Sequence, residues 1–160
     1  MFTYGRDFRI TILGASHEDY VGILIDGIKA GTHIDFDQIK TSLGRRRPAS
    51  DEETSRREED GLTVVSGYEN DHTTEAPLVI LIKNSDVRKS DYSDIKDAFR
   101  PGHADYSKFF KYQGQAYETG GGIFSGRMTV ALVVAGEIAR QIHDFDISSE
   151  VIFAKANTGS

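Results

Sequence analysis

The sequence contains no cysteine among its 160 residues. The chain therefore has no disulfide framework, no thiolate nucleophile and no cysteine-ligated zinc or iron–sulfur site. Any redox chemistry has to come from a bound cofactor. The sequence also lacks an apolar run near the roughly 18 residues that a membrane span requires, and residues 1–6 lack the basic-then-apolar order of a signal peptide. These absences predict a cytoplasmic protein without a membrane partner.

An excess of positive charge is missing as well, because 25 acidic residues outweigh 19 basic ones and give a net charge of −6. Nucleic-acid affinity depends on clustered cations that neutralise phosphates, so a nucleic-acid partner is not expected. The cations are nevertheless clustered, with Arg45, Arg46 and Arg47 in one block. This clustering favours a small anionic ligand. The length and a hydrophobic content of 38% predict one globular domain over residues 1–160.

Hydrophobic periodicity predicts strands and helices without a regular βαβ alternation, which favours an α+β sandwich over a Rossmann fold. Strands are expected at residues 8–13, 20–25, 62–66, 78–82 and 147–153. One helix begins after Asp35, an N-cap that Gln38 completes as a capping box, with Ile34 and Ile39 as a hydrophobic staple. A second, amphipathic helix is expected at residues 127–143. Residues 83–122 have poor periodicity, and a long segment of that kind in a compact domain usually carries function or packs around something.

Two polar motifs each contain a histidine. His17 follows Ser16 and precedes Glu18 in a predicted loop, where it can transfer protons near neutral pH or serve as a structural histidine bonded to backbone. Arg100 and His103 flank a Pro-Gly turn that is followed by an aspartate. That turn suits anion binding with proton transfer, or else it is a tight turn with exposed polar groups.

Two further motifs suit anions. The block from Arg45 to Arg47 is followed by Pro48, and guanidinium groups bind phosphate and carboxylate bidentately. The alternative is a solvated basic turn. The glycines of residues 120–122 precede a predicted helix, where backbone N–H groups and the helix dipole favour a phosphate. A glycine hinge is the alternative here, and neither the Walker loop nor the dinucleotide fingerprint is present.

Taken together and in this order, the motifs resemble those of chorismate synthases. The matching series covers residues 5–153 and consists of Gly14-x-Ser16-His17, Leu24 to Gly27, Arg45 to Pro48, Arg56-Arg57-Glu58, Ser66-Gly67, Asp91 to Ile95, Arg100 to Tyr106, Lys111-Tyr112, and the glycine triplet with Phe124 to Arg127.

The resemblance implies a β-α-β sandwich of which this chain carries about half. It implies a lyase that removes phosphate from 5-enolpyruvylshikimate 3-phosphate by 1,4-anti elimination to give chorismate. The implied cofactor is reduced FMN, which is not consumed, with NADPH as a candidate reductant of the flavin. A homo-oligomer, either a tetramer or a dimer, is implied as well.

The same resemblance assigns roles to individual residues. His17 would protonate the leaving phosphate, and His103 would act at the reduced flavin. The implied substrate-binding residues are Arg46, Arg47, Arg100 and Arg127, and the implied flavin-contacting residues are Ile123, Phe124 and Ser125. If these roles hold, His17 and His103 should lie on the same side of the fold and face a cleft lined by Arg46 and Arg127.

Several residues depart from the family pattern. Ala15 and Glu18 stand where glutamate and glycine are usual, Ile123 stands where arginine or histidine is common, and residues 51–53 are acidic where another cation is usual. Together with the half length, these departures predict that the chain alone binds FMN weakly or not at all and does not turn over. The alternative function is a catalytically inactive homologue that acts as a binding or assembly module.

Overall fold

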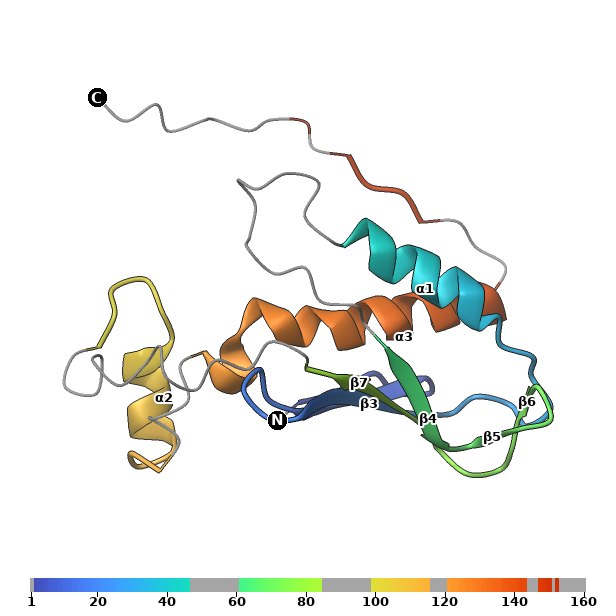
Figure 1. Cartoon of the computed structure of the whole chain (residues 1–160), viewed down its shortest axis with the longest axis horizontal. Helices are drawn as coiled ribbons and strands as arrows, with labels where there is room; N and C mark the ends of the chain where they lie inside the picture. Colours follow the sequence, from blue (N-terminus) through green and yellow to red (C-terminus); the bar gives the residue numbers. More distant parts are fainter. Residues whose placement is uncertain are drawn as a thin grey trace.

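One antiparallel sheet, covered on one face by two helices, forms the body of the computed structural model (Figure 1). The structure describes residues 2–46, 61–84, 99–115, 121–143, 147–150 and 152. The predicted α+β fold is thus confirmed, with one sheet layer and one helix layer in the part described.

The sheet has five strands in the order β1-β2-β3-β7-β4. The strands are β1 (Thr3–Tyr4), β2 (Arg9–Gly14), β3 (Tyr20–Asp26), β7 (Leu78–Lys83) and β4 (Leu62–Ser66). Ile23 of β3 pairs with Ile12 of β2 on one side and with Ile80 of β7 on the other. On β4 the register against β7 shifts between Val64 and Ser66, which marks a β-bulge at this edge of the sheet.

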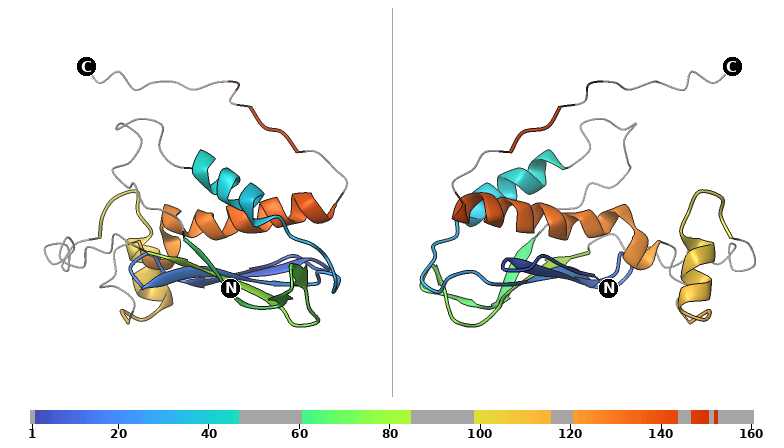
Figure 2. Two further views of the ribbon diagram at one scale, coloured as in Figure 1. Left: turned by 45° about the vertical axis from the view of Figure 1, so that its right-hand side comes forward. Right: turned by 180° about the vertical axis from the view of Figure 1, so that it is seen from behind.

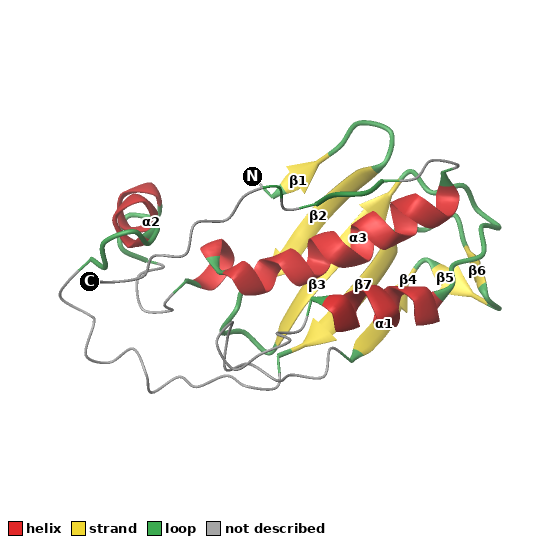
Figure 3. Ribbon diagram, turned by 90° about the horizontal axis from the view of Figure 1, so that it is seen from above, coloured by secondary structure: helices red, strands yellow, loops and turns green. Residues whose placement is uncertain are grey.

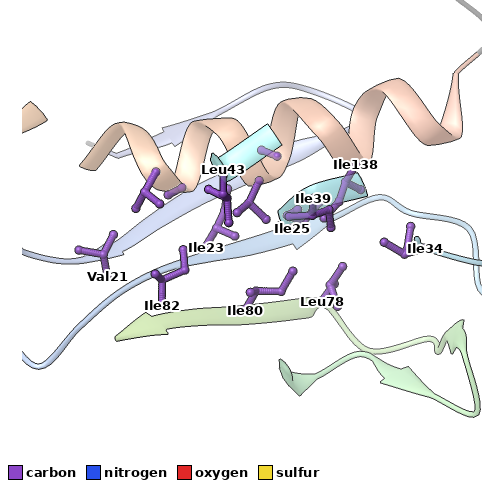
Figure 4. Close-up of a cluster of buried hydrophobic side chains, with 14 of the residues drawn as sticks. Val21, Ile23, Ile25, Ile34, Ile39, Leu43, Leu78, Ile80, Ile82 and Ile138 are labelled. Atoms are coloured by element: carbon purple, nitrogen blue, oxygen red, sulfur yellow. The ribbon is translucent and has the colours of Figure 1, made fainter. Parts of the chain in front are cut away.

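The core lies between the sheet and the helices (Figure 4). Alternate side chains of a strand point to opposite faces, so every second residue of β3 and β7 enters this layer. These residues are Val21, Ile23, Ile25, Leu78, Ile80 and Ile82, each no more than 2% exposed. The predicted strands at residues 20–25 and 78–82 are therefore the two central strands of the core.

The two helices that cover the sheet are α1 (Phe36–Arg45) and α3 (Thr129–Ile142), which lie side by side on the same face (Figures 2 and 3). The Asp35 carboxylate caps α1 by accepting hydrogen bonds from the backbone N–H groups of Asp37 and Gln38, and the Gln38 amide donates back to it at 2.9 Å. The predicted N-cap is therefore confirmed. The second helix begins at Thr129, two residues later than predicted, because residues 126–128 form a 3-10 turn.

A polar network joins α1 to α3. Ser42 donates to the Glu137 carboxylate at 2.7 Å, and Arg140 donates to the same carboxylate at 2.7 Å. Burial alone would raise the pKa of Glu137, but the hydrogen bonds from Arg140 and Ser42 together hold the pKa below its usual value. A charge buried between the helices is thus fully paired, as a buried charge has to be.

The hairpin of β5 (Tyr68–Glu69) and β6 (His72–Thr73) has no counterpart among the predicted strands. Its turn residues Asn70 and Asp71 both have positive φ, 48° and 63°, as the commonest two-residue hairpin turn requires. Each strand is only two residues long, too short for an alternating pattern to be visible in the sequence.

One predicted strand is wrong over the residues that the structure describes. Residues 147–150 and 152 form no strand, and Ile147 and Ile152 are 72% and 89% exposed. A β-rich run becomes a strand only where a neighbouring strand supplies hydrogen bonds.

Within residues 83–122, where no element was expected, the structure has a short helix, α2 (Asp105–Lys111). Within the described ranges, no helix combines the length and apolar character needed to cross a bilayer.

Candidate functional site

Three segments meet at one end of the sheet, where β2 ends, β3 begins and β7 ends. The first segment is the loop from Gly14 to Asp19, which contains His17. Gly14 has a φ of +77°, and a Cβ atom there would lie 2.2 Å from the Tyr20 carbonyl oxygen, so only glycine fits. This turn fixes the point at which the loop leaves β2 and returns as β3.

Asn84, which follows β7 directly, holds this loop in place. Its side-chain amide donates to the carbonyl oxygens of Ala15 at 3.2 Å and Glu18 at 2.7 Å, and its backbone N–H donates to Asp19 at 2.9 Å. Asn84 is only 7% exposed. One buried amide therefore anchors the loop around His17 to the end of β7.

The second segment contains Arg127, a cation that is only 5% exposed. Its Nε donates to Asn84 Oδ1 at 2.9 Å, and one terminal nitrogen donates to the Lys83 carbonyl oxygen at 3.2 Å. A buried guanidinium needs such acceptors because an unpaired buried charge is costly. Arg127 is thereby fixed against the end of β7.

The glycine-rich turn before Arg127 contacts the His17 loop directly. The backbone N–H of Ser16 donates to the Gly122 carbonyl oxygen at 3.2 Å. Gly122 itself is buried and has a φ of +53°. Ser125 begins the 3-10 turn that leads into α3, and its hydroxyl oxygen accepts from the Arg127 backbone N–H at 3.2 Å. Two motifs more than a hundred residues apart in sequence are thus neighbours.

The third segment is the end of α1. Arg46 is the C-cap of that helix, and its guanidinium donates to Thr129 Oγ1 at 3.2 Å and to the Gly126 carbonyl oxygen at 3.3 Å. It therefore lies at the N-terminal end of α3, where the helix dipole adds positive potential. A guanidinium and a helix N-terminus together favour an anion.

His17 is half-buried in the first segment, and its Nδ1 lies 2.8 Å from the hydroxyl oxygen of Ser16, which is 1% exposed. A buried hydroxyl at this distance fixes the orientation of the imidazole ring. The arrangement is suited to proton transfer, because a ring held in one orientation directs its other nitrogen to a fixed position.

His103 and Arg100 belong to a different part of the chain, the turn that precedes α2. In Figure 1 this helix lies beyond the end of α3, outside the sheet. His103 is exposed, with its Nδ1 3.2 Å from the Pro101 carbonyl oxygen. A cleft shared by His17 and His103 stays a prediction. Arg47 lies outside the described residues.

Arg100 forms a bidentate ion pair with Asp105, with nitrogen–oxygen distances of 2.7 and 2.9 Å. Hydrogen bonding to Arg100 lowers the pKa of the buried Asp105 carboxyl to about 2. Lys108 is also buried, and its desolvation lowers the pKa of the ammonium group although the charge of Asp105 opposes that shift. The turn that carries His103 is thus tied to the first turn of α2.

This ion pair predicts a pH dependence. A carboxyl whose pKa is lower in the folded state stabilises that state above its unfolded pKa, so the contribution of Asp105, about 2 kcal/mol, should be lost as pH falls from about 4 to 2. In Arg100→Met the pKa of the Asp105 carboxyl should rise to its usual value of 3.8 or above, because burial then raises the pKa without an opposing guanidinium, as followed by carbon-13 NMR. Arg9→Met, which breaks an exposed ion pair with Asp26, is the matched control and should leave the titration of Asp105 unchanged. A carboxyl that titrates near 3.8 in the unmodified chain would contradict the ion pair.

A hollow of about 340 Å³ opens beside the His17 loop, on the face of the sheet that the helices do not cover. Leu13, Tyr20 and Leu81 supply its apolar walls, and Glu18 and Asp19 supply carboxylates. None of the predicted substrate-binding arginines lines it. Because carboxylates repel anions, this hollow does not suit a phosphorylated substrate.

The predicted flavin-contacting residues fit one edge of a flavin. Phe124 is 42% exposed, so its ring is accessible to a planar aromatic partner. Ser125 uses its oxygen as an acceptor for Arg127, which leaves its hydroxyl hydrogen to donate. Ile123, next to these two residues, offers only an apolar side chain.

Asn84 and Thr129 were not among the predicted site residues, although both organise the site. The signal for Asn84 is its position, because a polar amide directly after a buried strand lies at the end of the sheet. Thr129 gives no comparable signal, because a threonine at the start of a helix is common and its contact with Arg46 joins residues 83 positions apart.

Comparisons with known proteins agree with the resemblance seen in the motifs. The family model described as chorismate synthase matches residues 8–156. The chorismate synthase of Chitinophaga pinensis is 44% identical over 142 residues, which cover 89% of this chain and 43% of that protein. The one from Methanocaldococcus jannaschii is 40% identical over 153 residues, which cover 95% of this chain and 40% of that protein.

A solved structure agrees at the level of the fold. The chain superimposes on a crystal structure of chorismate synthase with a TM-score of 0.63 and 23% identity, covering 86% of this chain and 34% of that one. Measured against the two curated relatives named above, the chain spans about two fifths of their length.

Proposed function

The chain belongs to the chorismate synthase family, and on that premise we propose that it forms the phosphate-binding side of a chorismate synthase active site. The reaction is the 1,4-anti elimination of phosphate from 5-enolpyruvylshikimate 3-phosphate to give chorismate. The observation that supports this function best is the meeting of His17, Arg46 and the glycine-rich turn at one end of the sheet.

The elimination breaks two bonds of the substrate, the carbon–oxygen bond to phosphate and one carbon–hydrogen bond of the ring, so a proton is lost from the ring as phosphate departs. The departing oxygens require a proton and positive potential. We assign the proton to His17, whose ring orientation is fixed by Ser16 at 2.8 Å. Arg46 and the N-terminal end of α3 supply positive potential, and Arg127 adds a second cation behind the glycine-rich turn. Arg47 and Arg100 complete the proposed set of substrate-binding arginines.

Reduced FMN supplies electron density to the reaction when it is bound, with NADPH proposed as the reductant of the flavin. Phe124 and Ser125 would hold one edge of the flavin, with Ile123 beside them. His103 would act at the flavin, which requires the turn before α2 to close over the site in the complete enzyme.

We propose that the complete enzyme is a cytoplasmic homo-oligomer, either a tetramer or a dimer. The exposure of Leu132 on α3 (44%) and Val65 on β4 (58%) supports association.

The test is an anaerobic assay with reduced FMN and the enolpyruvyl substrate, which follows chorismate absorbance and released phosphate. The chain alone is expected to give no turnover, because groups that act as one unit lose factors of about a hundred or more when any is missing. Addition of a separate polypeptide that supplies the remaining length of a relative, such as that of Chitinophaga pinensis, should restore activity.

In the restored assembly, His17→Gln should lower kcat by about a hundredfold or more, because it removes the proposed proton donor. His143→Gln, which changes an exposed histidine at the other end of α3, is the matched control and should leave kcat unchanged. Turnover by the chain alone would contradict the need for a second part. If the assembly binds substrate but never forms chorismate, the chain is instead a binding or assembly module.

A further inference from the structure

Two histidines lie side by side at the end of the sheet opposite the proposed active site. His33, in the segment between β3 and α1, forms an antiparallel β-bridge with His72 of β6. Their ring centroids are 5.9 Å apart, with an angle of 60° between the ring planes, and both residues are exposed. In Figure 1 the β5–β6 hairpin and α2 mark opposite ends of the molecule. The elimination proposed above assigns no role to this pair.

Hydrogen bonding fixes the tautomer of both rings. His33 Nδ1 lies 3.0 Å from the Asp71 carbonyl oxygen, and His72 Nδ1 lies 2.9 Å from the Asn70 carbonyl oxygen. A carbonyl oxygen only accepts, so Nδ1 carries the hydrogen in each neutral ring and Nε2 carries the lone pair. Histidines that bind metals almost always have their other ring nitrogen bonded in this way, to a backbone carbonyl or a carboxylate.

The backbone that carries the two histidines is held firmly by Thr73, which is 5% exposed. Its N–H donates to the Thr32 carbonyl oxygen at 2.8 Å, and its carbonyl oxygen accepts from Gly31 at 2.8 Å. The Thr73 hydroxyl donates to Lys29 O at 2.8 Å and accepts from the Thr32 N–H at 3.0 Å. The two rings therefore sit on a preorganised scaffold, which limits the entropy lost when both bind one ligand.

The separation of the rings matches a shared metal ion. With a metal–nitrogen distance of about 2.1 Å, two imidazoles on one ion have their centroids about 5.2 Å apart at a tetrahedral angle and up to about 6.4 Å apart as the angle at the metal opens towards 180°. The observed 5.9 Å falls within that range. Glu69 faces His72 in the hairpin register, so its carboxylate adds negative potential on the same face.

We propose that His33 and His72 bind a divalent transition metal ion of the class that prefers imidazole, such as Zn²⁺ or Ni²⁺, through their Nε2 atoms. Over the described part of the chain, no group of three or more histidine, aspartate or glutamate side chains is arranged to hold a metal. The site therefore has two protein ligands, and water completes the coordination. A bound ion cross-links the β5–β6 hairpin to the segment that leads into α1.

The test is titration of the 160-residue chain with ZnCl₂, followed by calorimetry and by nitrogen-15 NMR of the imidazole rings. We expect saturable 1:1 binding, with the Nε2 signals of His33 and His72 shifting while Nδ1 stays protonated. His33→Asn and His72→Asn each keep a donor at the position of Nδ1 and remove Nε2, so each should weaken zinc binding about tenfold or more. His143→Asn is the matched control and should leave the affinity unchanged.

Three results would overturn the proposal: no saturable binding, equal affinity in His33→Asn and the unmodified chain, or equal weakening by His143→Asn. Circular dichroism before each titration shows whether a variant is folded, so that only folded variants are compared. A further supporting result is a zinc-dependent rise in Tm in the unmodified chain that is absent from the double variant His33→Asn/His72→Asn.

Discussion

Replacing Asn84 by alanine should lower the free energy of unfolding by about 3 kcal/mol, because the change leaves buried polar groups without partners. The Asn84 side chain donates to the carbonyl oxygens of Ala15 and Glu18 and accepts from Arg127. Arg127 is only 5% exposed, so the loss of its acceptor is especially costly. Urea denaturation of the two proteins measures the difference.

The contact between Asn84 and Arg127 can be isolated by a double-mutant cycle with Arg127→Met. Because both single variants break the same hydrogen bond, the double variant should be less destabilised than the sum of the two, by about 1 to 2 kcal/mol. Thr63→Ala, on the exposed face of β4, is the control and should change stability by less than about 0.5 kcal/mol. Strict additivity of the two changes would show that these residues do not share a contact.

Ile80→Ala should cost about 3 to 5 kcal/mol, because Ile80 is fully buried in the middle of β7 and the change creates a cavity between sheet and helices. The neighbouring Val79 lies on the face of the sheet that the helices leave open, and Val79→Ala should cost less than about 1 kcal/mol.

The comparison of these two variants also tests the register. A shift of one residue along β7 would exchange the two faces of the strand, so the larger loss would then appear at Val79. Equal losses at the two positions would contradict a sheet covered by helices on one face only. Thermal or urea denaturation at neutral pH is sufficient to distinguish these results.

The elements that the sequence predicted well are those in which a pattern of apolar residues, or a local capping motif, extends over several consecutive positions. Residues 20–25 and 78–82 are both rich in apolar and β-branched residues, and both are core strands in the structure. The helix after Asp35 was predicted because its cap is local, with donor and acceptor three residues apart. Such signals survive in a single sequence because they do not depend on distant parts of the chain.

Other features depend on contacts that a single sequence does not reveal. The insertion of β7 between β3 and β4 brings Tyr20 opposite Lys83, and no local pattern specifies that neighbour. Asn84 organises the His17 loop through hydrogen bonds to residues 66 and 69 positions away. Residues 147–153 have the composition of a strand, but the described residues there have no partner strand, so composition alone gave a wrong prediction.

Of the candidate site, the sequence identified His17, Arg46, Arg127 and the glycine-rich turn, which the structure brings to one end of the sheet. The sequence did not reveal that Arg127 is buried whereas Arg46 is more exposed, because burial is a property of the packed structure. The roles of all these residues rest on resemblance, and His103 and Arg100 lie apart from the others, in the turn before α2.

The bulge in β4 affects how the chain meets other polypeptides. An edge strand with a long, flat row of unpaired N–H and carbonyl groups can recruit a strand from another molecule, which is how many aggregates grow. Here β4 is interrupted between Val64 and Ser66, and the opposite edge, β1, is only two residues long. Over the residues that the structure describes, neither edge of the sheet therefore offers an extended ladder to which a strand of another molecule could be added. We therefore expect a second polypeptide to contact the faces of the sheet and helices, where side chains rather than backbone determine which partner fits.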